Sequence, residues 1–319
     1  MTLHIVRRVL FSIPILLVIS GIIFGILALA PGDPMAAFAT DPSMSPEVRE
    51  NVRRSLGLDA PIHVRYVKWL TAFVQGDMGY SFTSRSPVSG LLSQRLATTL
   101  IVVGSAYVIS VLLAIPLGVL AATRPYSIFD QITTTLAFIG FSLPTFFTGL
   151  LLIILFSVRL RWFPFIYNST LVVDDLASFG EQLRQSFLPV LVLVLFQTAA
   201  LMRYVRSSVL EAVQMDYVRT ARAKGLKEGV ILNRHVLRNA LIPVVTLIAL
   251  GLPAVFTGAL ITEQIFRVPG IGSLLISSIT TSDTPVVMAI TVIYAVLIVF
   301  FNLVADILYT VLDPRVRYH

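Results

Sequence analysis

The stretch "LATTLIVVGSAYVISVLLAIPLGVLAAT", from Leu96 to Thr123, contains no Asp, Glu, Lys, Arg or His. A helix needs about 20 apolar residues, within a range of roughly 17–25, to cross the hydrocarbon core of a bilayer. A single charged side chain at mid-bilayer costs about 2.5–3.5 kcal/mol on insertion scales. A run this long and this free of charge therefore indicates a membrane span.

Five further charge-free runs repeat this pattern: Val9–Gly32, Gln131–Val158, Gln185–Met202, Asn239–Thr262 and Thr284–Ala305. The composition agrees, because the mean hydropathy is +0.87 and charged residues make up 13% of the chain, against about 25% in soluble domains. The sequence therefore predicts an all-α, polytopic membrane protein with six transmembrane helices.

The first run also has features of a secretory signal peptide, since Arg7 and Arg8 precede it and "LALA" at Leu27–Ala30 resembles a cleavage site. Its apolar stretch is much longer than the roughly 7–15 residues of a signal peptide, and Pro31 follows at once. We expect this run to be kept as the first span.

The distribution of positive charge predicts the orientation. With both termini inside, 13 of the 24 Lys and Arg residues fall in the much shorter inner segments, so their density is higher there, as the positive-inside rule requires. This predicts cytoplasmic N- and C-termini. We also expect the protein to lie in the cell inner (plasma) membrane. The net charge of +7 then requires no nucleic-acid partner.

The longest outer segment, residues 33–94, contains two helix signals. Ser45 and Pro46 open one helix, which Gly57 closes. Pro61 opens a second, amphipathic helix that runs to Gly76, with Trp69 as an anchor at the membrane interface. Two shorter outer segments are expected at Arg159–Arg184 and Glu263–Asp283.

The sequence lacks the residues that several kinds of chemistry require. There is no cysteine, no G-x-x-x-x-G-K-[ST] nucleotide-binding loop, and no Asp or Glu at the middle of an apolar run. The four histidines also lie outside these runs. We therefore expect a non-catalytic protein without a cofactor, a metal site or a proton relay of its own.

Proline and glycine interrupt several runs. The stretch "GFSLPTFFTG", Gly140–Gly149, is the main candidate for a hinge or pore lining. The individual candidates are Gly140, Ser142, Pro144 and Pro253. Helix kinks and close packing explain the same residues without a functional role.

A basic segment, "DYVRTARAKG" at Asp216–Gly225, separates the fourth and fifth runs. Asp216 is expected to cap a short helix that Gly225 ends in a left-handed conformation. The spacing puts Tyr217, Ala221 and Lys224 near one face, and the small alanines permit another surface to approach closely. A second helix, residues 227–240, then leads to Pro243. Binding to anionic lipid and docking to a protein partner are both open.

This segment resembles the cytoplasmic EAA loop of ABC importer permeases, in the form typical of the dipeptide/oligopeptide (peptide/nickel) branch. Ala221 and Gly225 match that loop, whereas Arg219 and Thr220 stand where Glu and Ala are usual. Further matching stretches are "LAPGDP" (Leu29–Pro34), "GDMGYSF" (Gly76–Phe82), "RNALIPVVT" (Arg238–Thr246), "FRVPGIG" (Phe266–Gly272) and "LDPRVRY" (Leu312–Tyr318).

The resemblance implies a type I, binding-protein-dependent importer permease that forms half of the translocation path. The implied partners are a second homologous permease, one or two ABC ATPase subunits that bind ATP and Mg, and an extracytoplasmic solute-binding protein. The implied ATPase-coupling residues are Asp216, Tyr217, Val218, Arg219, Thr220, Ala221, Arg222, Ala223, Lys224 and Gly225.

The same resemblance divides the chain into four regions. These are an N-terminal transmembrane helix (1–32), an extracytoplasmic region with short helices (33–94), a five-helix permease core (95–308) with its coupling loop (203–242), and a cytoplasmic tail (309–319). The solute is expected to be peptide-like, while nickel chelates, glutathione and oligosaccharides stay open. The alternative function, a self-sufficient channel or secondary carrier, lacks the intramembrane acids that carriers use.

Overall fold

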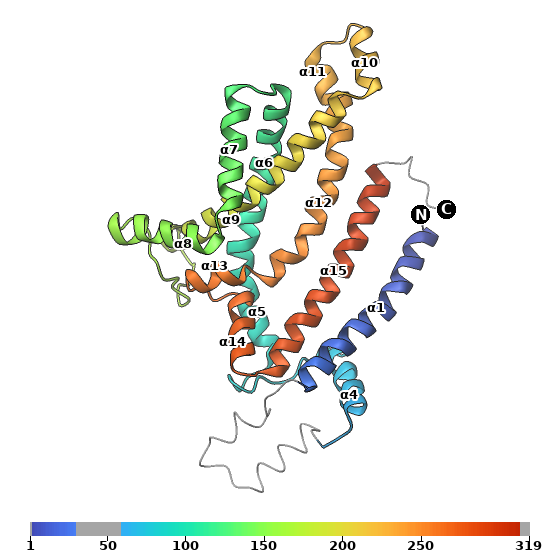
Figure 1. Ribbon diagram of the computed structural model, residues 1–319. Helices are drawn as coiled ribbons and strands as arrows, with labels where there is room; N and C mark the ends of the chain where they lie inside the picture. Colours follow the sequence, from blue (N-terminus) through green and yellow to red (C-terminus); the bar gives the residue numbers. More distant parts are fainter. Residues whose placement is uncertain (1, 30–58, 313–319) are drawn as a thin grey trace.

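The computed structural model describes residues 2–29 and 59–312, and these residues are almost entirely helical (Figure 1). Within them, only Tyr80 and Pro87 pair as a β-bridge. Five helical stretches are long and apolar enough to cross a membrane: Arg7–Leu29, Val88–Thr123, Leu176–Val213, Glu228–Ile265 and Thr284–Leu308. A bent pair, Ile128–Gly140 with Thr145–Arg159, gives the sixth. The prediction of an all-α protein with six spans is confirmed when this pair is counted as one span.

The described residues form sixteen helical elements. In chain order they are α1 (Thr2–Leu29), α4 (Ile62–Val74), α5 (Val88–Thr99), η1 (Leu100–Gly104), α6 (Ser105–Thr123), α7 (Ile128–Ser142), α8 (Thr145–Leu152), η2 (Ile153–Arg159), α9 (Leu176–Val213), α10 (Asp216–Ala223), α11 (Glu228–Val230), η3 (Ile231–Val236), α12 (Leu237–Thr257), α13 (Leu260–Ile265), α14 (Ile271–Thr280) and α15 (Thr284–Leu312). The η elements are short π-helical segments. η1 and η3 continue directly into α6 and α12, whereas η2 extends α8 to its end at Arg159.

Several helices extend well beyond the apolar runs. α9 begins at Leu176, before the run that starts at Gln185, and it continues to Val213. Asp175 caps its start, because its Oδ1 accepts a hydrogen bond of 2.7 Å from the backbone N–H of Ser178. Apolarity marks the part of a helix that suits lipid, whereas caps and glycines mark where the helix ends.

The third apolar run is not one straight helix, contrary to the simple prediction of a span over Gln131–Val158. α7 ends at Ser142, α8 begins at Thr145, and the two axes are bent by 99°. Leu143 is extended (φ −86°, ψ 128°), as is usual for a residue before proline, and Pro144 has ψ 138°. Figure 1 shows α8 lying across the direction of α7.

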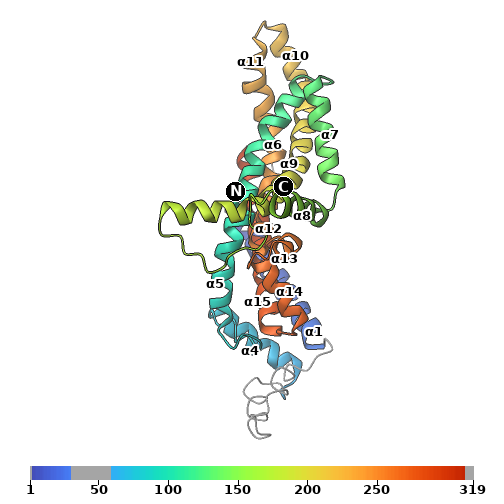
Figure 2. The same ribbon diagram turned by 90° about the vertical axis from the view of Figure 1, so that its left-hand side faces the viewer.

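The helices pack along their lengths into an elongated molecule with α10 and α11 at one end and α4 at the other (Figures 1 and 2). α6 packs against α9, and a Cβ atom at Gly118 of α6 would lie 2.7 Å from Cβ of Val205. α12 packs against both α9 and α15, while α1 lies along the outside of α15. Arg8 of α1 forms an ion pair with Asp306 of α15. The described ends of the chain therefore lie at the same end of this helix pair.

The predicted helix after Pro61 is confirmed as α4, which Pro61 precedes and Gly76 (φ +90°) follows. Its aromatic face packs on α1, where the rings of Trp69 and Phe24 lie 5.9 Å apart. The Tyr66 hydroxyl donates a hydrogen bond to the carbonyl of Leu17. The helix predicted between Ser45 and Gly57 lies outside the described residues.

Candidate functional site

The basic segment of the sequence forms α10, a two-turn helix held between the end of α9 and the start of α11 (Figure 1). Met215, with φ −70° and ψ 150°, is the last non-helical residue before it. Asp216 is therefore the first helical residue and makes no capping hydrogen bond, which corrects the prediction that Asp216 is the cap. Its carboxylate instead lies 3.3 Å from the Arg219 guanidinium, in the first turn, where the helix dipole favours negative charge.

The end of α10 follows the prediction for Gly225. This glycine has φ +73°, which a side chain with a Cβ rarely adopts. The reversal lets the N–H of Leu226 donate to the carbonyl of Ala221 at 3.3 Å, while the N–H of Gly225 donates to Arg222 at 2.9 Å. Two carbonyls at the helix end are thereby satisfied, and the chain turns sharply into α11.

One face of α10 is buried inside the chain itself. Val218 is 0% exposed and Ala221 is 4% exposed, and both belong to an apolar cluster that includes Val209, Ile231 and Val236. The small Ala221 was predicted to let another surface approach closely, and the surface that packs against it belongs to this chain. It includes the following segment, η3, which folds back and covers this side of α10.

The rest of α10 is exposed. This side is mainly basic, with Arg219, Arg222 and Lys224 against Asp216. Arg222 forms two hydrogen bonds with Glu228 of α11 at 2.8 and 3.2 Å, and Glu228 raises the pKa of the Arg222 guanidinium above its ordinary value. The exposed side of α10 is thus polar, and it has no apolar stripe of the kind that inserts into lipid. The exposed positions are Asp216, Tyr217, Arg219, Thr220, Arg222, Ala223, Lys224 and Gly225. We call this set the α10 face.

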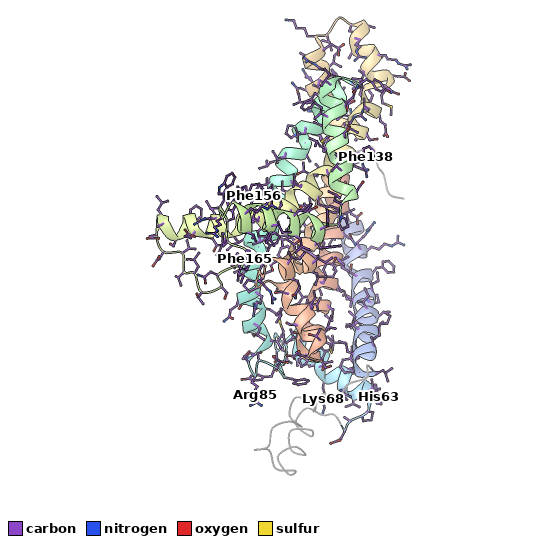
Figure 3. All side chains as sticks on the ribbon, turned by 60° about the vertical axis from the view of Figure 1, so that its left-hand side comes forward. His63, Lys68, Arg85, Phe138, Phe156 and Phe165 are labelled. Carbon is purple, nitrogen blue, oxygen red and sulfur yellow. The ribbon has the colours of Figure 1, made fainter. Side chains whose placement is uncertain are left out.

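Three of the four hinge or pore candidates meet at one place. Gly140, Ser142 and Pro144 surround the bend between α7 and α8, which we call the elbow. A pocket of about 250 Å³ lies there, and only threonines interrupt its apolar lining. Its lining residues are Leu136, Ile139, Gly140, Leu143, Thr145, Thr148, Val192, Leu195 and Phe196. Figure 3 shows Phe138 and Phe156 on either side of the elbow, on α7 and on η2.

Pro253 does not belong to the elbow. It is buried within α12 and is not part of the lining of that pocket. α12 continues through both Pro243 and Pro253 to Thr257, so neither proline ends the helix. Gly258 (φ +79°) follows Thr257 and redirects the chain into α13.

Glu263 forms a buried cluster that the sequence analysis missed. Its side chain is 1% exposed although it was expected to begin an outer segment. Its Oε2 accepts a hydrogen bond of 2.8 Å from the N–H of Ser273 in the first turn of α14, and its Oε1 accepts one of 3.2 Å from Thr99. Thr99 in turn accepts a bond of 2.8 Å from the N–H of Ile271. This cluster joins α5, α13 and α14.

A second missed contact joins α7 to α9. Asp130 is 2% exposed and accepts two hydrogen bonds from Arg206, at 2.6 and 2.8 Å. In the sequence analysis Arg206 contributed only to the count of positive charges in the inner segments. The signal that could have found the pair is an acid placed directly before a long apolar run, in a protein with few acids.

Among the residues that the structure describes, no three His, Asp or Glu side chains group closely enough to hold a metal ion.

Two models of a transporter family match the chain. The family described as "Binding-protein-dependent transport system inner membrane component" matches residues 114–318, and its N-terminal companion matches residues 1–103. The chain belongs to this family. It is an ABC transporter permease component, and its apolar helices agree with a multi-pass inner membrane protein.

Curated relatives match over the full length. The chain is 45% identical over 319 residues to the oligopeptide transport system permease protein AppB of Bacillus subtilis, with 100% of both chains covered. It is 39% identical over 313 residues to a putative peptide permease protein of Brucella suis, covering 98% of each. The resemblance to the dipeptide/oligopeptide permease branch is thereby confirmed.

A solved structure shows the same fold. A chain from an amino acid ABC transporter, crystallised with histidines, matches with a TM-score of 0.52 at 16% identity. The match covers 69% of this permease and 94% of that chain. At this identity the likeness supports the type I permease fold and leaves the solute open.

Proposed function

We propose that this permease is one of two homologous membrane subunits of an ATP-driven importer for peptide-like solutes. The relatives named as oligopeptide and peptide permeases support the solute class. In this proposal a binding protein delivers the solute at the outer side. ATPase subunits bind ATP and Mg at the cytoplasmic side, and the permease itself carries out no catalysis.

The α10 face carries this proposal. Its exposed side chains belong to a helix whose opposite side is locked into the core by Val218 and Ala221, and whose end is fixed by Gly225. A rigid, polar helix at the end of the molecule suits a protein partner, because ordering it on binding costs little conformational entropy. We therefore assign ATPase docking to the α10 face, in preference to lipid binding.

Orientation is part of the same proposal. The α10 end holds many of the basic residues, which the positive-inside rule places in the cytoplasm. α4 lies at the opposite end of the molecule (Figures 1 and 2). The binding protein would then meet α4 and the neighbouring outer segments, and both chain termini would be cytoplasmic.

In the proposed mechanism, ATP-driven closure of the ATPase subunits displaces α10 and shifts the spans between inward-open and outward-open states. Such a shift requires the ATPase to contact the two states with different affinities. Because α10 continues almost directly from α9, with Gln214 and Met215 between them, a displacement of α10 acts on a long helix.

Transport in reconstituted vesicles tests the proposal. The permease, the second permease and the ATPase subunits are placed in proteoliposomes with binding protein and a labelled oligopeptide on the binding-protein side. We expect accumulation only with hydrolysable ATP and binding protein. Equal uptake without ATP would contradict the proposal and favour a self-sufficient channel or carrier.

A further inference from the structure

Asp130 and Arg206 form an ion pair in which the acid is buried, with its side chain 3% exposed, and the guanidinium is 24% exposed. Arg206 donates from Nε to Oδ1 at 2.6 Å and from Nη2 to Oδ2 at 2.8 Å, a two-point geometry that fixes orientation as well as distance. The backbone N–H of Tyr126 donates to Oδ2 at 2.9 Å, and the Thr134 hydroxyl donates to Oδ1 at 3.2 Å. Each carboxylate oxygen thus has two donors, so the hydrogen-bonding capacity of the buried acid is well satisfied.

Two further contacts hold α7 to α9 along its length. The Arg203 guanidinium lies 5.6 Å from the centre of the Phe138 ring, which Figure 3 labels near the end of α7. Two residues further along α7, and one turn back along α9, a Cβ atom at Gly140 would lie 3.6 Å from Cβ of Ala199. The contacts extend from the first turn of α7 to its last.

The two helices have different functional regions at their ends. α9 ends at Val213, directly before α10. α7 ends at the elbow, where Leu143 and Pro144 break the third span. A displacement of the α10 face passes to α9 along the chain and to η3 through the buried side of α10. On the α9 route it reaches the elbow through α7 only if α7 does not slide along α9.

We propose that Asp130 and Arg206 are positioning residues that make α7 and α9 a single rigid lever, which delivers displacement of α10 to the elbow. This rests on the proposed function of α10. In this proposal the pair acts through α7 and α9 and not through contact with the solute or the ATPase. It sets how much of the movement of α10 arrives at the elbow. Without the pair, α7 slides along α9, and part of each displacement of α10 does not reach the elbow.

The first test measures coupling in the reconstituted transporter. Asp130→Asn keeps the shape of the side chain and removes its charge. We expect uptake per ATP hydrolysed to fall roughly two- to thirtyfold, while ATP hydrolysis stimulated by loaded binding protein continues. If the Asp130–Arg206 pair contributed only to folding, Asp130→Asn would lower uptake and ATP hydrolysis equally, in proportion to the amount of intact complex. Size-exclusion chromatography measures that amount.

A matched control exists in the same chain. Asp306→Asn removes the acid of another Arg–Asp pair, which joins α1 to α15 away from the lever. It should leave uptake per ATP unchanged. An unchanged ratio in Asp130→Asn, with the complex intact, would overturn the proposal. Failure of the wild-type transporter to use ATP for uptake would instead refute the proposed function.

A cross-link provides an independent test, because the chain contains no cysteine. The 3.6 Å separation of the Cβ positions at Gly140 and Ala199 lies in the range of about 3.5–4.5 Å for disulfides. In the double variant Gly140→Cys, Ala199→Cys, oxidation should leave uptake equal to that of the same variant when reduced. Added to Asp130→Asn, oxidation should restore coupling. If oxidation blocks uptake and reduction restores it, the two helices move relative to each other and the lever is wrong.

Discussion

Gly270 lies so close to the buried carboxylate of Glu263 that a Cβ atom on the glycine would be less than 3.0 Å from all three carboxyl atoms. Gly258 and Gly272 approach the same carboxylate nearly as closely. The acid is therefore enclosed by backbone, with the first turn of α14 supplying the N–H of Ser273 at the positive end of the helix.

Gly270→Ala should destabilise the permease by about 1–3 kcal/mol, because the new methyl group forces Glu263 away from its hydrogen bonds. Thermal unfolding of the purified protein in detergent measures the change. Gly90→Ala is the control, since a Cβ atom at Gly90 would meet nothing within 4 Å. Equal midpoints for the two variants would show that the enclosure of Glu263 does not matter for stability.

The contact between α6 and α9 gives a second prediction about glycine. A Cβ atom at Gly118 would lie 2.7 Å from Cβ of Val205 and 2.8 Å from the carbonyl oxygen of Met202. Gly118→Ala should cost about 1–3 kcal/mol of stability. Adding Val205→Ala should not restore it, because the Met202 oxygen belongs to the backbone. Full recovery in the double variant would mean that the side chain alone sets the helix separation.

The two sides of α10 should respond differently to substitution. Val218→Ala removes buried methyl groups and should lower stability by roughly 2 kcal/mol. Arg219→Ala, on the exposed side, should change stability by no more than about 0.5 kcal/mol and still weaken ATPase binding. Unfolding midpoints and binding of purified ATPase to the permease in nanodiscs separate the effects. Normal ATPase affinity in Arg219→Ala would remove that residue from the docking face.

Gly225→Val places a β-branched residue at φ +73° and should cost at least about 1–2 kcal/mol in the docking conformation. Uptake should fall while the amount of protein in the membrane stays normal. Gly225→Asn is the control, because Asn tolerates left-handed backbone far better than Val. Wild-type uptake by the valine variant would show that the end of α10 has no role in coupling.

The spans were predictable from the sequence because the cost of placing charge in lipid acts on each run separately. The ends of the helices were less predictable. α9, for example, begins before its apolar run because Asp175 caps it in a polar region. The hinge candidates near Pro144 lie at a real break, because proline restricts the residue before it whatever the fold.

Contacts between distant segments could not be read from the chain. Glu263 receives its hydrogen bonds from Thr99 and Ser273, and only the folded arrangement of α5 and α14 brings them together. The same reason explains Ala221. Its position on the helix was predictable, but the segment that covers it, including Ile231, folds back from later in the sequence.

Site-directed cross-linking in native membranes tests the central claim most directly. Thr220→Cys puts a single cysteine on the α10 face of a chain that has none, and Lys68→Cys puts one on exposed α4 at the opposite end. With a bifunctional reagent, we predict that position 220 cross-links to a subunit whose sequence contains a nucleotide-binding loop, and that position 68 does not. Cross-linking of position 220 to lipid alone, or equal cross-linking of both positions to that subunit, would contradict the assignment of α10 as the ATPase docking site.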